Sequence, residues 1–143
     1  MAKRILVPLD RASTSEAVLP FVADLARGAG STVRLLNVKP IPNNVVSDSG
    51  RVIAYTDQEM ARLETEGSSY LDAIASVLDG VPVERVVRFG DPAREILVEA
   101  EAFGADIIAL TTSGRSWLRQ TVSRGIAARI FRNSRVPVLL LRQ

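Results

Sequence analysis

The side chains able to do chemistry in this chain are carboxylates, lysines, arginines and hydroxyls, because its 143 residues include no cysteine and no histidine. Disulfides, thiolate nucleophiles, Ser-His triads and ordinary zinc sites are therefore excluded. Any catalysis would depend on carboxylates, lysine, hydroxyls, backbone groups or a borrowed metal. No cluster of carboxylates in the sequence suggests a magnesium site made by protein alone. We therefore expect a protein that is not an enzyme and has no metal site of its own.

Charge is distributed unevenly, although the net charge is only +2. All 16 acidic residues lie at or before Asp106. The rest of the chain carries only basic charges, at Arg115, Arg119, Arg124, Arg129, Arg132, Arg135 and Arg142. Such asymmetry fits either a polyanionic partner or a basic, solvated helix face. For nucleic acid we favour the solvated face, because only Trp117 and Phe131 are aromatic there and no reading motif appears. The asymmetry mildly favours a small phosphate ligand.

Five short runs rich in Val, Ile and Leu predict the strands, at residues 5–9, 33–38, 83–87, 107–110 and 136–141. The runs are continuous rather than alternating, which is typical of strands covered on both faces. Segments with helical spacing lie between them. This alternation predicts a single α/β domain over residues 1–143, with a parallel sheet and helices on both faces.

Four predicted helices have apolar residues at spacings of three and four, over residues 17–26, 60–78, 92–103 and 118–132. The first follows a capping-box pattern, Ser13 to Glu16, and contains Pro20, which should kink or shorten it. The third opens with Asp91 as N-cap and Pro92 at the first helical position. The polar stretch 40–56 is expected to be a long, mobile loop.

Ligands of such sheets bind beyond the carboxyl ends of the strands, at the point where strand order reverses. The loops at that edge begin at Asp10, Lys39, Phe89 and Thr111. The amino-terminal apolar run is too short for the core of a signal peptide, and no run is long enough to span a membrane. We therefore expect a cytoplasmic protein with its site in these loops.

Several of these segments resemble the universal stress protein family. Residues 5–10, Ile-Leu-Val-Pro-Leu-Asp, resemble its opening strand with the terminal Asp, and residues 35–38, Leu-Leu-Asn-Val, resemble its second strand, usually written L-L-H-V. Residues 90–93, Gly-Asp-Pro-Ala, resemble the turn that opens its third helix, and residues 106–110 and 136–139 match its last two strands. The resemblance covers essentially the whole chain. It implies a flavodoxin-like, three-layer fold whose five-stranded parallel sheet has the order 3-2-1-4-5.

The same resemblance implies where the site and the partner surface lie. With that strand order, Asp10 faces the loop of residues 111–114 across the switch point. Members of the family commonly form dimers, often through the last strand. The resemblance therefore implies a homodimer. Independently, the run from Val136 to Leu141 would be an exposed apolar edge in a monomer, which favours a covered edge.

Nucleotide-binding members of the family carry G-x-x-G, nine residues, and then G-S or G-T. The glycines let the backbone approach the phosphates, and the following helix N-terminus supplies N–H donors. Aligned here, Thr111 replaces the first glycine, Gly114 is kept, Arg124 replaces the third glycine and Gly125 replaces the hydroxyl residue. Thr111 and Arg124 add bulk beside the phosphates. Arg124 could fill the phosphate pocket, or it could pair with a phosphate.

The resemblance implies a nucleotide-contacting set that comprises Asp10, Val38, Leu110, Thr111, Gly114, Arg124, Gly125 and Ile126. Asp10 could accept a hydrogen bond from an adenine amino group or a ribose hydroxyl, or it could serve as a capping or turn residue. Val38 and Leu110 could flank the base, or they could be ordinary core residues.

Two functions are compatible with these residues. The first is a stress-response regulatory module that acts as a homodimer and through protein partners, with weak or no nucleotide binding. The second is a sensor that binds ATP or AMP through the loop after the fourth strand, with magnesium only alongside the nucleotide. A slow nucleotide hydrolase is less favoured, because no base is placed near the expected phosphates.

Overall fold

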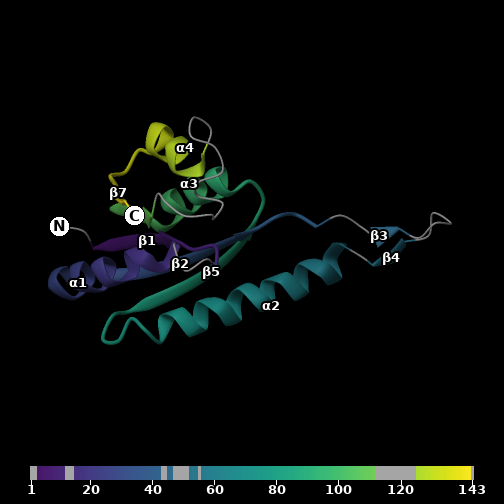
Figure 1. Ribbon diagram of the computed structural model, residues 1–143, viewed down its shortest axis with the longest axis horizontal. Coiled ribbons are helices and arrows are strands. Elements are labelled where there is room, and N and C mark those ends of the chain that lie inside the picture. Colours follow the sequence, from purple (N-terminus) through teal and green to yellow (C-terminus); the bar gives the residue numbers. More distant parts are fainter. Residues whose placement is uncertain are drawn as a thin grey trace.

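The computed structural model contains a five-stranded sheet between two layers of helices (Figure 1). It describes residues 3–11, 15–42, 45–46, 52–54, 56–111 and 125–142. The strands are β1 (Arg4–Pro8), β2 (Thr32–Lys39), β3 (Val45–Val46), β4 (Val52–Ala54), β5 (Val83–Phe89), β6 (Ile107–Thr111) and β7 (Val138–Leu141). The helices are a 3₁₀ turn, η1 (Ser15–Val18), followed by α1 (Leu19–Ala29), α2 (Thr56–Ala75), α3 (Pro92–Phe103) and α4 (Ile126–Asn133).

The main sheet has the order β5-β2-β1-β6-β7, and all its strand pairs are parallel. Counting only its five strands, this is the order 3-2-1-4-5, so the predicted flavodoxin-like α/β fold is confirmed. Strand order reverses between β1 and β6. The two edges of the sheet are β5 and β7.

Two apolar cores cover the two faces of the sheet. On one face, Leu35 and Ala109 pack with residues of α1 and α2, such as Val22 and Leu71. On the other face, residues such as Leu110 pack with α3 and α4. Burial of both faces explains why the strands read as continuous apolar runs. In the described part of the chain, no helix is long and apolar enough to cross a membrane.

The predicted start and end of α3 are confirmed. The Asp91 carboxylate accepts a hydrogen bond from the backbone N–H of Arg94 at 3.1 Å, and Pro92 occupies the first turn. The helix ends at Gly104, whose φ of 67° lies in the left-handed region that glycine adopts readily. Both signals are local, which is why the sequence predicts these boundaries closely.

An ionic network fixes α3 to β2 and β5. Glu99 of α3 is 3% exposed and bonds to Arg34 at 2.5 Å and to Arg88 at 3.0 Å. The Arg34 guanidinium also lies 4.1 Å from the centre of the Phe103 ring. A buried carboxylate needs such partners, because an unpaired buried charge is strongly unfavourable.

The first and last helices begin later than their periodicity predicts. Residues 15–18 form a 3₁₀ turn, and Pro20 stands in the first turn of α1, where its missing N–H costs nothing. Pro20 therefore shortens the helix rather than kinking it. Gly125 is extended at φ −61° and ψ 155° and caps α4, so the helix predicted over 118–132 does not continue through it. Ser13 and residues 118–124 lie outside the described residues.

The stretch predicted as a loop at 40–56 contains secondary structure. β3 and β4 pair antiparallel within it, and α2 already begins at Thr56. Figure 1 shows this two-stranded pair projecting away from the main sheet, beyond the amino-terminal end of α2. Strands of two and three residues are too short for a period to be detected in the sequence.

Candidate functional site

The candidate site lies at the carboxyl ends of β1 and β6, where the two strands separate. Their paired residues are Ile5 with Ile107 and Leu6 with Ile108, although the strands continue to Pro8 and Thr111. By contrast, β1 pairs with β2 along its whole length, as far as Pro8. The separation at the switch point is the place where a sheet of this order accepts a ligand.

Asp10 follows β1 at this edge and is partly exposed. Its backbone N–H donates to the Ser15 hydroxyl at 3.3 Å, so the turn into η1 is fixed through the main chain. One residue earlier, the Leu9 carbonyl accepts a bond from the Asn37 side-chain amide at 2.8 Å. The backbone around Asp10 is thus held on both sides, and its position does not depend on a ligand.

Thr111 ends β6 and is fully buried. Side chains alternate along a strand, and Ala109 packs in the core of α1 and α2, so Thr111 faces that side. Its hydroxyl has no hydrogen-bond partner among the residues that the structure describes. A threonine methyl and hydroxyl therefore occupy interior space at the position where nucleotide-binding members have a glycine.

Val38, Leu110 and Ile126 belong to the apolar core on the α3 and α4 side. Their exposed fractions are 6%, 0% and 5%, so they form the buried floor beneath the site rather than its open walls. Gly125 supplies an extended backbone at the start of α4. Gly114 and Arg124 lie outside the described residues.

A second group of residues, not singled out by the sequence, holds Asp10 against α2. We call Arg11, Lys39, Glu66 and Tyr70 the β1–α2 clamp. Arg11 and Lys39 reach the same oxygen of Glu66, Oε1, at 2.5 and 3.1 Å. Arg11 also lies 5.8 Å from the centre of the Tyr70 ring. The clamp joins the residue after Asp10 to the middle of α2.

The clamp has two features that single it out physically. Arg11 has φ 73°, the left-handed region in which a residue with a side chain is strained. Lys39 is 8% exposed, so its charge requires a partner. The hydrogen bond from Lys39, together with its charge, lowers the pKa of Glu66 below its usual value, and Arg11 and Arg62 add to this effect.

Tyr70 extends the connection to η1. Its hydroxyl donates to the Glu16 carboxylate at 2.6 Å. Burial, the bond to Glu16 and the nearby Asp10 charge all raise the pKa of Tyr70 above its usual value, so it stays protonated at neutral pH. Sequence reasoning missed this contact because the two residues are 54 positions apart.

The packing of α2 against the sheet is unusually close at Gly67. A Cβ atom there would lie 3.0 Å from the Asn37 side-chain oxygen and 3.0 Å from a Val87 methyl. That Asn37 oxygen has no hydrogen-bond partner in the described part of the chain, and the residue is 3% exposed. Any larger residue at position 67 would have to displace one of these neighbours, so glycine allows α2 to lie this close to the sheet.

No metal centre is evident in the part of the chain that the structure describes, where no group of three or more acidic residues is suitably arranged. The geometry can therefore offer a ligand one carboxylate, at Asp10, and the backbone N–H groups at the start of α4. These groups suit hydrogen bonding and anion binding.

Comparison with known proteins gives a consistent result over the whole chain. The model of the Universal stress protein family matches residues 1–142. The universal stress protein MJ0531 of Methanocaldococcus jannaschii is 25% identical over 146 residues, covering 99% of this chain and 82% of that protein. YxiE, a universal stress protein of Bacillus subtilis, is 25% identical over 148 residues, covering 99% of this chain and 100% of that protein.

Solved structures agree with these sequence matches. The structure of protein MJ0577, also from M. jannaschii, has a TM-score of 0.77 and 25% identity, covering 99% of this chain and 96% of that one. A universal stress protein in complex with cAMP has a TM-score of 0.66 at 13% identity, with coverage of 99% and 97%. One from Archaeoglobus fulgidus in complex with dAMP has a TM-score of 0.63 at 18% identity, with coverage of 96% of each chain.

Proposed function

Because this chain belongs to the universal stress protein family, we propose that it is a stress-response regulatory module. It acts as a homodimer and through protein partners, binds nucleotide weakly or not at all, and is not an enzyme. The observation that carries the proposal is the contrast between the two edges of the main sheet.

The β5 edge is charged and protected. Glu84 and Arg85 are exposed along it, and Arg85 pairs with Asp72 at 2.6 Å. Charged residues on an edge strand discourage pairing with another chain. The β7 edge, in contrast, reads Val-Leu-Leu-Leu, and Leu140 is 37% exposed. An apolar edge of this kind favours association with a second copy.

Exposed apolar side chains flank β7 on both faces of the sheet. On α4, Arg129 points to α3 through its bond to Asp91, so Phe131, about 200° further round the helix, faces the other way. On α1, Arg27 bonds to the Asp79 carbonyl after α2, and Phe21 and Leu25 lie on the opposite flank. Phe131, Phe21 and Leu25 are 62%, 56% and 37% exposed. Together with β7 they form an apolar surface around the sheet edge, and homodimer interfaces are more apolar than the rest of a protein surface.

Weak nucleotide binding is supported by the phosphate end of the site. Thr111 is buried where the family motif has its first glycine, and Gly125 has no hydroxyl to donate. Among the described residues, Asp91 is the carboxylate bonded to the first turn of α4, and it is paired with Arg129 at 2.7 Å. Asp10 follows β1 and lies next to η1. These features favour a regulator over a hydrolase.

A nucleotide sensor is the second candidate function. It is favoured by the separation of β1 and β6 beside Asp10 and by the extended Gly125 at the start of α4. The structures in complex with cAMP and dAMP indicate that this fold can present an adenine nucleotide site. Their identities of 13% and 18% support the fold rather than the site residues.

Two measurements test the proposal. Sedimentation velocity at micromolar protein should give the mass of a dimer, and a monomer over the whole accessible concentration range would contradict it. Calorimetric titration with ATP and AMP, with and without magnesium, should give no heat below millimolar nucleotide. Dissociation constants in the micromolar range, about −8 kcal/mol, would establish the sensor instead.

A further inference from the structure

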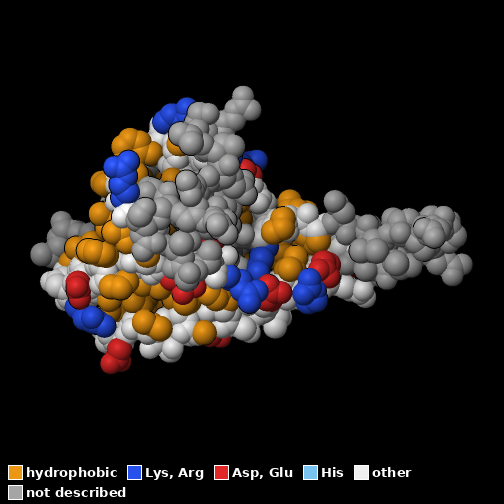
Figure 2. Space-filling model, in the orientation of Figure 1, with side chains coloured by type: hydrophobic (Ala, Val, Ile, Leu, Met, Phe, Trp, Pro, Cys, Tyr) orange, Lys and Arg blue, Asp and Glu red, His pale blue; other side chains and the backbone are white. Residues whose placement is uncertain are grey.

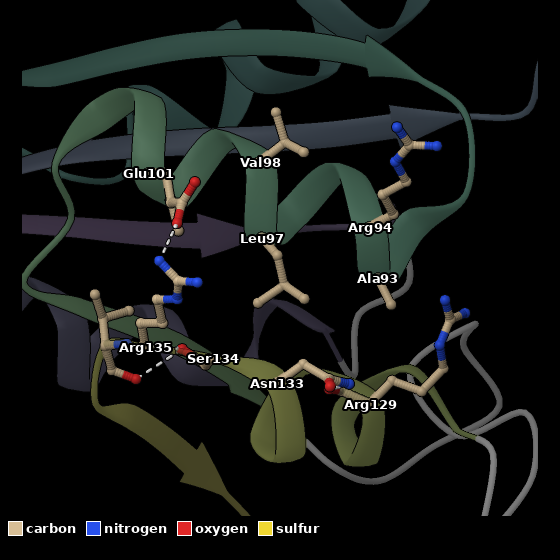
Figure 3. A pocket seen from close by; sticks show the side chains of 11 residues that line it. Ala93, Arg94, Leu97, Val98, Glu101, Arg129, Asn133, Ser134 and Arg135 are labelled. Atoms are coloured by element: carbon tan, nitrogen blue, oxygen red, sulfur yellow. Dashed lines mark hydrogen bonds and ion pairs between the residues drawn. The ribbon is translucent and has the colours of Figure 1, made fainter.

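A groove of about 410 Å³ lies between α3 and α4, away from the candidate nucleotide site (Figure 3). Its floor is apolar and built from Ala93, Leu97, Ala100 and Val136. In Figure 3 the Leu97 side chain points from α3 toward α4, across the middle of the groove. Its volume is in the range of sites that take a small ligand or a few side chains of a peptide.

The groove exists because α3 presents small residues to α4. Ala93, Leu97 and Ala100 recur at helical spacing on the facing side, and both alanines are almost fully buried. Because Ala93 and Ala100, one on each side of Leu97, have small side chains, the surface of α3 is shallowly depressed at both positions. Val98, 39% exposed, extends the apolar surface to the outer ridge of α3.

Arginines dominate the charge around this floor. Arg94, Arg129 and Arg135 line the groove, and Glu101 is the only acidic side chain that does. Arg129 is held by Asp91 at 2.7 Å. Arg94 forms no ion pair within the described chain, which leaves its charge available to a partner.

Glu101, the acidic residue that lines the groove, forms only a weak ion pair. Arg135 lies 3.7 Å from Glu101, and the two side chains are 89% and 71% exposed. An exposed pair at that distance contributes little, so an external carboxylate can replace Glu101 at Arg135. The described segment from 125 to 142 has no acidic residue, so α4 and β7 add no negative charge to the groove.

We propose that the groove between α3 and α4 binds a short acidic segment of a partner protein. An apolar side chain of the partner packs on Leu97 and Val136, and flanking carboxylates pair with Arg94 and Arg135. The inference rests on the proposed partner-binding function and gives it a docking face and a partner chemistry.

Charge complementarity selects this occupant over the alternatives. In a two-fold contact between copies with the groove on the symmetry axis, arginines would meet arginines. Nucleic acid would satisfy the arginines but not the apolar floor, and the described residues that line the groove include no aromatic side chain on which a base could stack. A peptide with an apolar anchor and acidic neighbours satisfies both the floor and the rim.

The test is selection from a random dodecapeptide library on the purified full chain, followed by anisotropy measurements on the enriched peptides. We expect peptides in which a leucine or phenylalanine is flanked by Asp or Glu. Arg94→Glu and Val98→Asp should each weaken their binding at least about tenfold, since each places a negative charge against the peptide carboxylates. Both positions are exposed, so the variants should fold.

Matched controls carry the same changes away from the groove. Arg85→Glu lies on the opposite face of the sheet, and Val77→Asp alters a valine that is 64% exposed. Both should bind within about twofold of the wild type. Binding that survives the groove variants, enrichment without acidic residues, or no enrichment at all would overturn the proposal.

A failure of the groove proposal can be distinguished from a failure of the homodimer proposal. Sedimentation of Arg94→Glu and Val98→Asp should give the wild-type mass, because neither residue lies at the β7 edge. If the wild type is a dimer but no acidic peptide binds, the groove proposal alone is wrong.

Discussion

Arg129 forms a two-pronged ion pair with Asp91, with nitrogen–oxygen distances of 2.7 and 3.0 Å. The same Asp91 carboxylate caps α3, so one side chain both begins a helix and ties it to α4. These two helices cover one face of the sheet, as Figure 1 shows. This surface carboxylate therefore adds a direct polar link between two helices that also share an apolar core.

Replacing Asp91 should separate its two roles. Asparagine is also a good N-cap, so Asp91→Asn keeps the cap and loses only the negative charge that pairs with Arg129. Asp91→Ala loses both and should lower the free energy of unfolding by about 1 kcal/mol more than Asp91→Asn. Urea unfolding followed by circular dichroism measures the free energy of unfolding of both variants. Equal losses in the two variants would show that capping contributes nothing.

Asp91 should also make stability depend on pH. The hydrogen bonds from Arg129 lower the pKa of Asp91 in the folded chain below its usual 3.8. Stability from this group is then complete above pH 3.8 and is lost as pH falls through the lower, folded value. Between pH 6 and pH 3 the wild type should lose more stability than Asp91→Asn. Asp24→Asn, at a carboxylate 86% exposed, should follow the wild type.

The buried hydroxyl of Thr111 predicts an unusual stabilising substitution. An unpaired buried polar group costs about 1–3 kcal/mol, and valine keeps the shape of threonine without the hydroxyl. Thr111→Val should therefore raise the free energy of unfolding by about 1 kcal/mol. Thr111→Ser keeps the hydroxyl and removes a methyl, so it should lower the free energy by about 1 kcal/mol. Destabilisation by valine would mean that the hydroxyl has a partner in solution.

The β1–α2 clamp can be tested by a double-mutant cycle. Glu66→Gln leaves Lys39 without its countercharge, and Lys39→Met removes that charge altogether. We expect Glu66→Gln to lower the free energy of unfolding and Lys39→Met to cancel most of this loss in the double variant. Glu66 is 35% exposed, which keeps the expected effect small. Additive effects in urea unfolding would show that the pair is not coupled.

The sequence predicts those parts of the fold that local signals determine. Continuous apolar runs place the five strands within about two residues, and Asp91, Pro92 and Gly104 define α3. Asp10 and Thr111 are correctly placed at the carboxyl edge, because the strand order follows from the resemblance. These features need no information about distant residues.

Distant contacts could not be predicted in the same way. Arg11 meets a partner 55 positions away, and Arg34 meets Glu99 across 65 positions. Charged residues in a sequence do not identify their partners until the helices are placed on the sheet. The start of α4 was missed for a different reason: apolar spacing extends through Gly125, but its extended backbone begins the helix only at Ile126.

The apolar β7 edge predicts variants that dissociate the proposed dimer. Leu140→Lys places a charge on the edge strand, and Phe131→Lys places one on the flank of α4. Each should shift the sedimentation mass at micromolar protein from dimer to monomer. Phe131 is 62% exposed, so its variant should fold even if Leu140→Lys does not. Val77→Lys, at a valine 64% exposed, is the control, and loss of the dimer there would refute the assigned surface.

Restoring the phosphate motif should create or strengthen nucleotide binding. The triple variant Thr111→Gly, Arg124→Gly and Gly125→Ser returns both glycines and the hydroxyl, so bulk at Thr111 and Arg124 no longer opposes the phosphates. We expect calorimetric titration with ATP to give at least about tenfold tighter binding than the wild type, or about 1.4 kcal/mol. Adding Asp10→Asn should reverse part of the gain in affinity if Asp10 accepts a hydrogen bond from the ligand.

Equal, weak binding by the wild type and the triple variant would mean that the three replacements are not what excludes the nucleotide. If the triple variant binds ATP more weakly than the wild type does, Arg124 is instead assigned as a phosphate ligand. That result would favour the sensor over the partner-binding regulator.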